Sequence, residues 1–326
     1  MFVGNALLDI KGLSTVFNTD YGVFPAIKDV NLSLKKGETL CIVGESGSGK
    51  TITSMSLMQL LPSSGKIASG EILFQDIDLV KLNRVEMNKI RGKSISMIFQ
   101  DPMSALDPVF TCGSQITEAI QIHEDISKEE AKRRAIELLK EVGIPHSETI
   151  FDAYPHELSG GMCQRVMIAM ALSCKPDLLI ADEPTTALDV TVQARILDLL
   201  NKIKKEFNMA ILLITHDLGV VAEMADRVAV MYAGQIVEEA DVMTIFKKPK
   251  HPYTKGLIKS VPPLHQVDKT LYSIPGNVPT INSMPKGCRF NPRCSFATDL
   301  CVEKEPELQK INSNHTVKCW HINEGV

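Results

Sequence analysis

A stretch of eight residues, GESGSGKT from Gly44 to Thr51, constrains this chain more than any other. It matches the pattern G-x-x-x-x-G-K-[ST], in which glycines let the backbone wrap so that its N–H groups face a phosphate. The stretch directly follows an apolar run, TLCIV, and precedes a helical pattern, TITSMSLMQLL, which is the strand–loop–helix context that the motif requires. The sequence therefore predicts a nucleotide-binding loop. Its members are Gly44, Ser46, Gly47, Ser48 and Gly49, with Lys50 on the β- and γ-phosphates and Thr51 on Mg²⁺.

Two carboxylates end a second apolar run, LLIADE, at Leu178 to Glu183. A strand tip near bound phosphates is where a Mg²⁺-directed aspartate belongs, so Asp182 is predicted to lie in the metal shell. Glu183 is predicted to polarise the attacking water as general base. An apolar strand that ends in Asp-Glu is common by itself, and a capped strand end is the alternative.

Composition excludes several classes of protein. The 35 basic and 39 acidic residues give a net charge of −4, so nucleic acid is not an expected partner. No run approaches the ~20 apolar residues of a membrane span, and MFVGNALLDIKG lacks the features of a signal peptide. The eight cysteines then indicate a reducing cytosol, where clustered thiols bind metals more often than they form disulfides.

The order of predicted elements favours an α/β fold. Strand-like runs dominate the first hundred residues, at 6–17, 26–44, 70–80 and 94–100. Helices are predicted at 127–142, with Ser127 as N-cap and Glu130 at the capping-box position, and at 161–174, 190–206 and 218–225. Strands at 177–181, 210–214, 227–231 and 235–238 alternate with them, which argues for a core of parallel strands. Proline enrichment after about Phe246 divides the chain into a main domain, 1–246, and an irregular C-terminal extension, 247–326.

A second glycine motif, LSGGMCQRV at Leu158 to Val166, opens a predicted helix and so makes a second anion-binding site. With it, the stretches MIFQDP, TALD and LLITHD resemble, in the same order, the motifs of the ATP-binding cassette (ABC) ATPases. The family signature usually has Gln where Met162 stands, although oligopeptide-type members commonly carry Met. The resemblance covers essentially the whole chain.

The resemblance implies a P-loop NTPase ABC cassette with a RecA-like core, an antiparallel β subdomain and a helical subdomain at about 102–175. It implies a dimer in which the signature of one cassette, at Ser159, Gly160 and Gly161, caps ATP held by the other. The roles that it implies for single residues are Gln100 in the Q-loop, sensing Mg²⁺ and the γ-phosphate; Asp189 in the D-loop; His216 on the γ-phosphate and attacking water; and Tyr21 stacked on adenine, with Phe17 and Phe24 as competitors.

Two stretches narrow the branch of the family. FQDPMSALDPVFTCGSQI, and the tail from HPYTKGLIKSVPPL to IPGNVPTINSMPKGCRFNPRC, resemble the dipeptide/oligopeptide importers. That branch implies an ATPase on the cytoplasmic face of the membrane, beneath two transmembrane permease subunits and paired with a second, identical or related ATPase. An extracytoplasmic protein would deliver the substrate. The expected substrate is a di- or oligopeptide, and nickel or another small solute is the alternative.

The sequence lacks the features expected of three other classes of nucleotide-binding protein. A non-transport ABC ATPase usually has two cassettes, a basic surface or coiled-coil insertions. A module that binds ATP without turnover would lack Glu183 or His216, and a P-loop kinase would not need LSGGM or ITHD.

Four of the eight cysteines lie in the tail, at Cys288, Cys294, Cys301 and Cys319. Their spacing lacks the C-x₂₋₄-C pairs usual for zinc and leaves iron–sulfur and zinc equally open. The family resemblance favours a [4Fe–4S] cluster, since importer ATPases with this tail hold one there. Zinc, with His315 or His321 as substitute ligands, is the alternative. Such a site would hold together a proline-rich tail with little core of its own.

Overall fold

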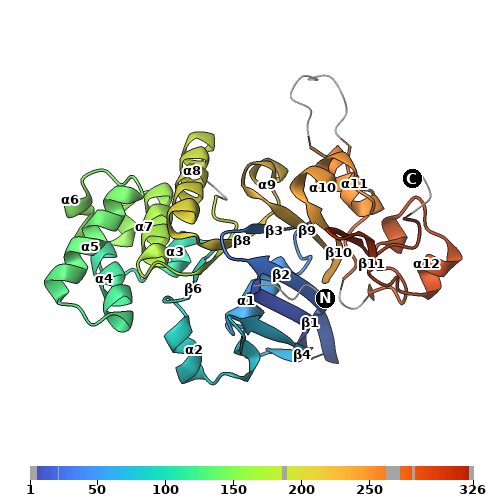
Figure 1. Ribbon diagram of the computed structural model, residues 1–326, viewed down its shortest axis with the longest axis horizontal. Coiled ribbons are helices and arrows are strands. Elements are labelled where there is room, and N and C mark those ends of the chain that lie inside the picture. Colours follow the sequence, from blue (N-terminus) through green and yellow to red (C-terminus); the bar gives the residue numbers. More distant parts are fainter. Residues whose placement is uncertain (1–5, 21, 186–188, 262–271, 281–282, 323–326) are drawn as a thin grey trace. The chain divides into compact units, whose positions relative to one another are not determined.

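A computed structural model describes residues 6–20, 22–185, 189–261, 272–280 and 283–322 (Figure 1). The chain forms two compact units, and each unit is built from several segments that are not contiguous in the sequence. The first unit contains 34–38 and 81–213 with the start of the chain, and the second contains 8–33, 39–80 and 214–326. Among the described residues, no helix has the length and apolar character needed to cross a membrane.

The second unit contains an antiparallel sheet with the strand order β2-β1-β4-β5. Its strands are β1 (Ala6–Thr19), β2 (Gly22–Lys35), β4 (Gly65–Phe74) and β5 (Ile77–Asp78). Leu8 and Ile10 of β1 are buried, at the alternate positions expected of a strand that covers a core with one face. Leu13 is also buried, beside an irregularity in the pairing with β4 between Lys11 and Ser14. The strands predicted in this region are confirmed, and β4 begins earlier than the predicted run.

The nucleotide-loop motif lies in the second sheet of this unit, between β3 (Thr39–Val43) and helix α1 (Lys50–Leu57). β3 is buried along its whole length and pairs in parallel with β9 (Arg227–Tyr232). β10 (Gln235–Asp241) continues the sheet, antiparallel to β9. Helix α9 (Leu218–Met224) follows the strand β8 (Ala210–Thr215).

The first unit combines parallel strands with helices. β6 (Ile95–Ile98) pairs in parallel with β7 (Leu178–Asp182), as the alternating pattern predicts. Ser127 caps the predicted helix α5, but the Glu130 carboxylate pairs with Arg133 and closes no capping box. The helices of this unit are α2 (Arg84–Ile90), α3 (Pro102–Ala105), α4 (Cys112–His123), α5 (Lys128–Glu141), α6 (Ser147–Phe151), α7 (Gly160–Leu172) and α8 (Val190–Phe207).

The C-terminal extension belongs to the second unit and contains short elements that its sequence did not predict. They are α11 (Pro252–Lys259), α12 (Asp299–Glu303), β11 (Gln309–Asn312) and β12 (His315–Val317), preceded by α10 (Val242–Lys247). β12 pairs with β10, so the extension adds two antiparallel strands to the sheet (Figure 1). The extension is therefore built onto the sheet that carries the nucleotide loop. The domain boundary at 246 stays a prediction.

Buried polar contacts tie the extension to β10. Glu238 is fully buried and accepts hydrogen bonds from the backbone amides of Lys250 (2.7 Å) and His251 (2.9 Å). Its Oε1 also lies 2.8 Å from Nε2 of His315 in β12. Burial raises the pKa of Glu238, but its hydrogen bonds, first of all the one from His315, outweigh burial and bring the pKa below its usual range. One carboxylate thus joins three segments of the unit.

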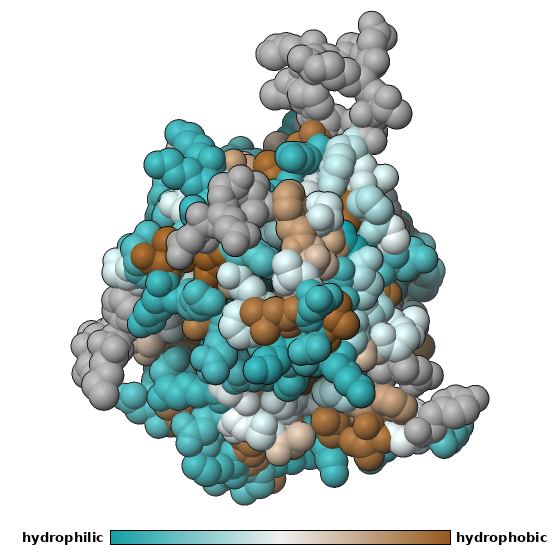
Figure 2. All heavy atoms as spheres, turned by 90° about the vertical axis from the view of Figure 1, so that its right-hand side faces the viewer, coloured by the Kyte–Doolittle hydropathy of each residue, from teal (hydrophilic) through white to brown (hydrophobic). Residues whose placement is uncertain are grey.

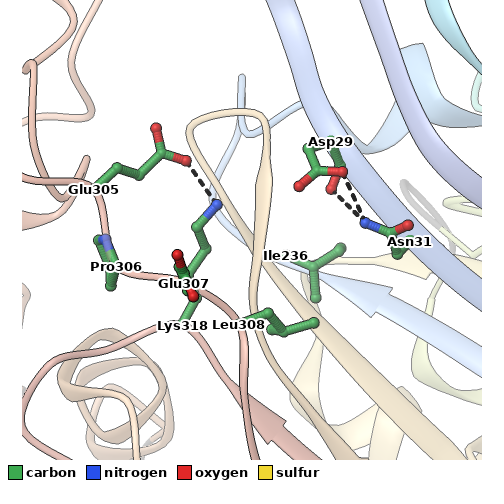
Figure 3. Close-up of a pocket in the computed structure, with 8 residues that line it drawn as sticks. All are labelled: Asp29, Asn31, Ile236, Glu305, Pro306, Glu307, Leu308 and Lys318. Carbon is green, nitrogen blue, oxygen red and sulfur yellow. Dashed lines mark hydrogen bonds and ion pairs between the residues drawn. The ribbon is translucent and has the colours of Figure 1, made fainter.

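A surface cavity of about 340 Å³ marks a second place where the extension meets the strands (Figure 3). Asp29 and Asn31 of β2 and Ile236 of β10 line it together with Glu305, Leu308 and Lys318 of the extension. Lys318 pairs with Glu305, which also accepts from Lys28. The face in Figure 2 is mostly hydrophilic, with apolar areas that are small and separate.

Candidate functional site

Glycines of the nucleotide loop allow the backbone to approach its neighbours too closely for any side chain. A Cβ at Gly44 would lie 2.1 Å from the carbonyl oxygen of Met231 and 2.8 Å from Ser48 Oγ. Gly49 has φ 105° and a Cβ there would lie 2.8 Å from Ile27 Cγ2. Only glycine fits both positions, so the close packing of the loop backbone depends on these two residues.

Polar groups of the loop fit a bound phosphate. Lys50 Nζ donates to the carbonyls of Gly44 (2.8 Å) and Glu45 (3.0 Å), which holds the ammonium over the loop. Ser48 Oγ is buried and has no hydrogen-bond partner among the described residues. A buried hydroxyl of this kind is costly unless a ligand satisfies it. Thr51, the predicted Mg²⁺ ligand, follows Lys50 in the first turn of α1.

His216 lies at the same cavity as the nucleotide loop. The cavity measures about 430 Å³ and is lined by Gly44, Glu45, His216 and residues of α9 and α11. His216 directly follows β8 and is exposed, and the next residue, Asp217, caps α9 by accepting from Gly219 N at 2.7 Å. The structure thus brings together two motifs that lie far apart in sequence.

In the first unit, the structure brings Gln100 to Glu183. Gln100 Nε2 donates to Glu183 Oε2 at 3.0 Å, so an amide from the end of β6 holds the carboxylate that follows β7. Glu183 has φ 50°, in the left-handed region that a residue with a side chain seldom adopts. Such conformations concentrate at functional sites, where surrounding structure holds them. Asp182, the last residue of β7, is buried.

The glycine motif at Ser159 begins helix α7 as predicted. Ser159 is the N-cap and its Oγ accepts from the Met162 amide at 3.3 Å, while a Cβ at Gly160 would meet nothing within 4 Å. The open approach to this helix end suits an anion. Gln164, buried in the same helix, donates to the carbonyl of Pro184 at 2.7 Å. The motif is therefore linked to the residue next to Glu183.

For the D-loop, Tyr21 and the tail cysteines, the structure supports less of the predicted site. Asp189 caps α8 by accepting from Val192 N at 2.9 Å, but the rest of the TALD motif and Tyr21 lie outside the described residues. Burial, with the charges of the other three tail thiols, raises the pKa of Cys288 to about 12. In the described part of the chain, no three His, Cys, Asp or Glu side chains are placed to hold one metal ion.

Comparison with known proteins identifies the family. The model of the ABC transporter family matches residues 27–186, and that of the oligopeptide/dipeptide transporter C-terminal region matches 237–301. The chain is 52% identical over 322 residues to the oligopeptide transport ATP-binding protein AppD of Bacillus subtilis, covering 98% of both chains. The chain belongs to the ATP-binding subunits of the oligopeptide/dipeptide ABC transporter family. This ABC ATPase is also 50% identical to the oligopeptide transport ATP-binding protein OppD of Haemophilus influenzae, over 97% of both chains.

Solved structures confirm the predicted fold of this ABC ATPase. The ATP-binding cassette MJ0796, solved as a dimer in a post-hydrolysis state with ADP and Pi, matches with a TM-score of 0.67 and 30% identity. The match covers 72% of this chain and 98% of that one. CbiO1 of Clostridium perfringens, part of the ABC transporter complex cbiONQ, has a TM-score of 0.63 and 29% identity, over 75% of this chain and 92% of that one.

Sequence reasoning missed the residues that support the nucleotide loop from the extension. Glu45 has its amide 2.9 Å from the hydroxyl of Tyr253 and its carboxylate bonded to Arg293. The tail motif HPY contains Tyr253, but nothing in the sequence shows that a residue so distant reaches the loop.

Proposed function

We propose that this ABC ATPase powers a membrane importer for di- or oligopeptides and works at the cytoplasmic face of the membrane. The observation that carries the proposal is the cavity that Gly44 and Glu45 of the nucleotide loop line together with His216. The buried Ser48 hydroxyl of the same loop, which has no hydrogen-bond partner among the described residues, supports a bound phosphate. Relatives that match nearly the whole chain are named as oligopeptide transport ATP-binding proteins, which supports a peptide substrate.

Each site residue has a proposed part in the reaction. Lys50 binds the β- and γ-phosphates, His216 binds the γ-phosphate and the attacking water, and Glu183 accepts the proton of that water. Gln100 keeps the Glu183 carboxylate in place through the 3.0 Å hydrogen bond between them. Thr51, Asp182 and Gln100 would hold Mg²⁺, which would neutralise charge on the phosphates. Tyr21 stacks on the adenine.

We infer that the partners are a second cassette, identical or related, and two permease subunits, with an extracytoplasmic protein that delivers the peptide. Ser159, Gly160 and Gly161 cap ATP bound by the second cassette, and Asp189 lies at that contact. The open helix end at Gly160 supports this part. Met103, Val109 and Phe110 are exposed apolar residues of the segment after Gln100, and they suit contact with a permease. Two ATP molecules close the cassette pair, and hydrolysis resets it.

Hydrolysis is tested with two variants and one control. Glu183→Gln should lower kcat by about 10²–10⁴-fold and leave ATP binding intact, because only the proton acceptor is lost. Lys50→Ala should weaken ATP binding itself. Glu141→Gln, at an exposed carboxylate of α5 in the same unit, serves as the matched control and should hydrolyse ATP at the normal rate. Normal turnover in Glu183→Gln together with normal ATP binding in Lys50→Ala contradicts the assignment.

The identity of the transported solute is tested by purifying this chain with its membrane partners and measuring which solute stimulates its ATPase activity. Peptides of two to several residues should stimulate hydrolysis, whereas nickel should not. Stimulation by nickel alone would replace the peptide assignment with the small-solute alternative.

We also propose a [4Fe–4S] cluster at Cys288, Cys294, Cys301 and Cys319, with zinc as the alternative. The similarity of the tail to importer ATPases supports it. The thiols as described do not form a ligand set, so the cluster takes no part in the mechanism above. Anaerobic purification followed by iron, sulfide and zinc analysis decides: a folded, colourless protein without iron and sulfide excludes the cluster.

A further inference from the structure

An ion pair connects the extension to the nucleotide loop. Nη1 of Arg293 lies 3.0 and 3.1 Å from the two carboxylate oxygens of Glu45, the residue after Gly44. The Arg293 side chain is 4% exposed and that of Glu45 is 30% exposed, so the contact is largely removed from water. Ion pairs of this kind are screened less than surface pairs.

Arg293 is fixed from the extension side as well. Its Nε donates to the carbonyl of Pro275 at 2.8 Å, and Nη2 donates to that of Ile274 at 3.3 Å. The guanidinium also lies 5.7 Å from the ring centre of Tyr232. A planar guanidinium with this many fixed neighbours has one orientation, so it sets where the Glu45 carboxylate points.

A second contact holds the backbone of the same residue. The Glu45 amide donates to the hydroxyl of Tyr253 in α11 at 2.9 Å. Tyr253 is fully buried, and its ring centre lies 4.6 Å from that of Tyr232 and 5.4 Å from that of Phe290. Side chain and backbone of Glu45 are thus both held by residues of the extension.

The charge of Glu45 matters because this residue lines the cavity with His216. A carboxylate beside a site for triphosphate repels the ligand unless a cation neutralises it. Arg293 supplies that cation from 248 residues further along the chain. Lys50 contacts the backbone carbonyl of Glu45, and its charge is needed for the phosphates.

We propose that Arg293 is a positioning residue for ATP binding: from the extension, it neutralises and orients Glu45 in the nucleotide loop. The extension thereby sets the ATP affinity of the cassette. This inference rests on the proposed binding of ATP at this loop.

The test is a double-variant cycle on the full chain, with Kd for ATP, KM and kcat measured at low and high salt. Arg293→Met should raise Kd and KM about tenfold, equal to about 1.4 kcal/mol, with a smaller change in kcat. The defect should shrink at high salt, where the bare carboxylate is screened. Adding Glu45→Gln to Arg293→Met should restore most of the affinity, because the repelling charge is gone.

Controls separate this role from folding and from the proposed function. Arg227→Met removes another partly buried arginine of the same unit, paired with Glu239, and should leave Kd within about twofold of the wild type. Lys50→Ala reports on the loop itself: normal ATP binding there contradicts the proposed function, whatever Arg293 does. If Lys50→Ala loses binding while Arg293→Met binds normally, only the inference fails.

The ATP affinity of the double variant decides whether Arg293 acts through its charge on Glu45 or only supports the fold. If the double variant binds no better than Arg293→Met, Arg293 merely supports the fold and the proposal is overturned. Should Arg293→Met fail to fold, Arg293→Lys carries the test, since it keeps the charge and loses the forked geometry. Arg293→Lys should weaken ATP binding about threefold, and adding Glu45→Gln should restore the affinity. Unchanged ATP affinity in Arg293→Lys overturns the proposal.

Discussion

Replacing Glu238 by glutamine should release the extension from β10. The carboxylate accepts from Lys250 N, His251 N and His315 Nε2, at 2.7, 2.9 and 2.8 Å. Glutamine has one acceptor oxygen and one NH₂ group. At least one buried donor would therefore face another donor. An unsatisfied buried donor costs about 1–3 kcal/mol and the lost charged hydrogen bond about 1.5–3, so we expect roughly 3 kcal/mol of destabilisation.

The only tryptophan of the chain makes this effect measurable in the extension itself. Trp320 lies three residues after Val317 of β12, and its Nε1 donates to the carbonyl of Lys304 at 3.1 Å. Urea unfolding followed by tryptophan fluorescence thus reports the extension, while circular dichroism reports the whole chain. Glu238→Gln should move the fluorescence transition to lower urea, ahead of the dichroism transition.

Glu71→Gln is the matched control, since Glu71 is an exposed carboxylate in another strand of the same unit, β4. A surface change of this kind should alter the free energy of unfolding by less than about 0.5 kcal/mol. If Glu238→Gln shifts the fluorescence transition no further than Glu71→Gln does, the buried carboxylate does not anchor the extension and the reasoning is refuted.

Three further predictions follow from single contacts. Gly44→Ala should weaken ATP binding at least about tenfold in a titration, since its Cβ would lie 2.1 Å from Met231 O and the loop must move. Ser159→Ala should cost α7 its cap, about 1 kcal/mol in a melt, and lower ATPase activity by more than that loss of folded protein explains. Burial lowers the pKa of His251 to about 4, so this group's contribution to stability is complete above pH 6.5 and falls by roughly 3 kcal/mol as pH drops to 4. His251→Asn, which can still cap α11, should flatten that fall in urea titrations.

The local parts of the site could be predicted from sequence because each is a contiguous motif. Gly44 to Thr51 specify a loop between a buried strand and a helix, and the structure has β3 and α1 there. Ser159 was predicted to open a helix, and it caps α7. His216 and Glu183 follow strands as their apolar runs indicate. In each case, residues that are neighbours in the sequence set the local backbone geometry.

Contacts between distant segments could not be predicted in this way. No periodicity indicates that Gln100 meets Glu183, because the contact depends on β6 and β7 being adjacent in one sheet. Proline content predicted an irregular extension, yet β12 pairs with β10 because a buried Glu238–His315 contact lies beside the pairing. Sequence gives the local propensity, while strand order and buried polar partners are properties of the assembled unit.

The cysteine-rich stretch of the tail acquires a role that does not depend on a metal. Between Cys288 and Cys294 lie Arg289, which bonds to the carbonyl of Ala233, and Phe290, which is 4% exposed and packs on Tyr232. Arg293 follows and reaches Glu45. These three side chains dock the stretch against the end of β9 and against Glu45 of the nucleotide loop. Whatever the thiols bind, a rearrangement of this stretch would move Arg293, and ATP affinity would change with it.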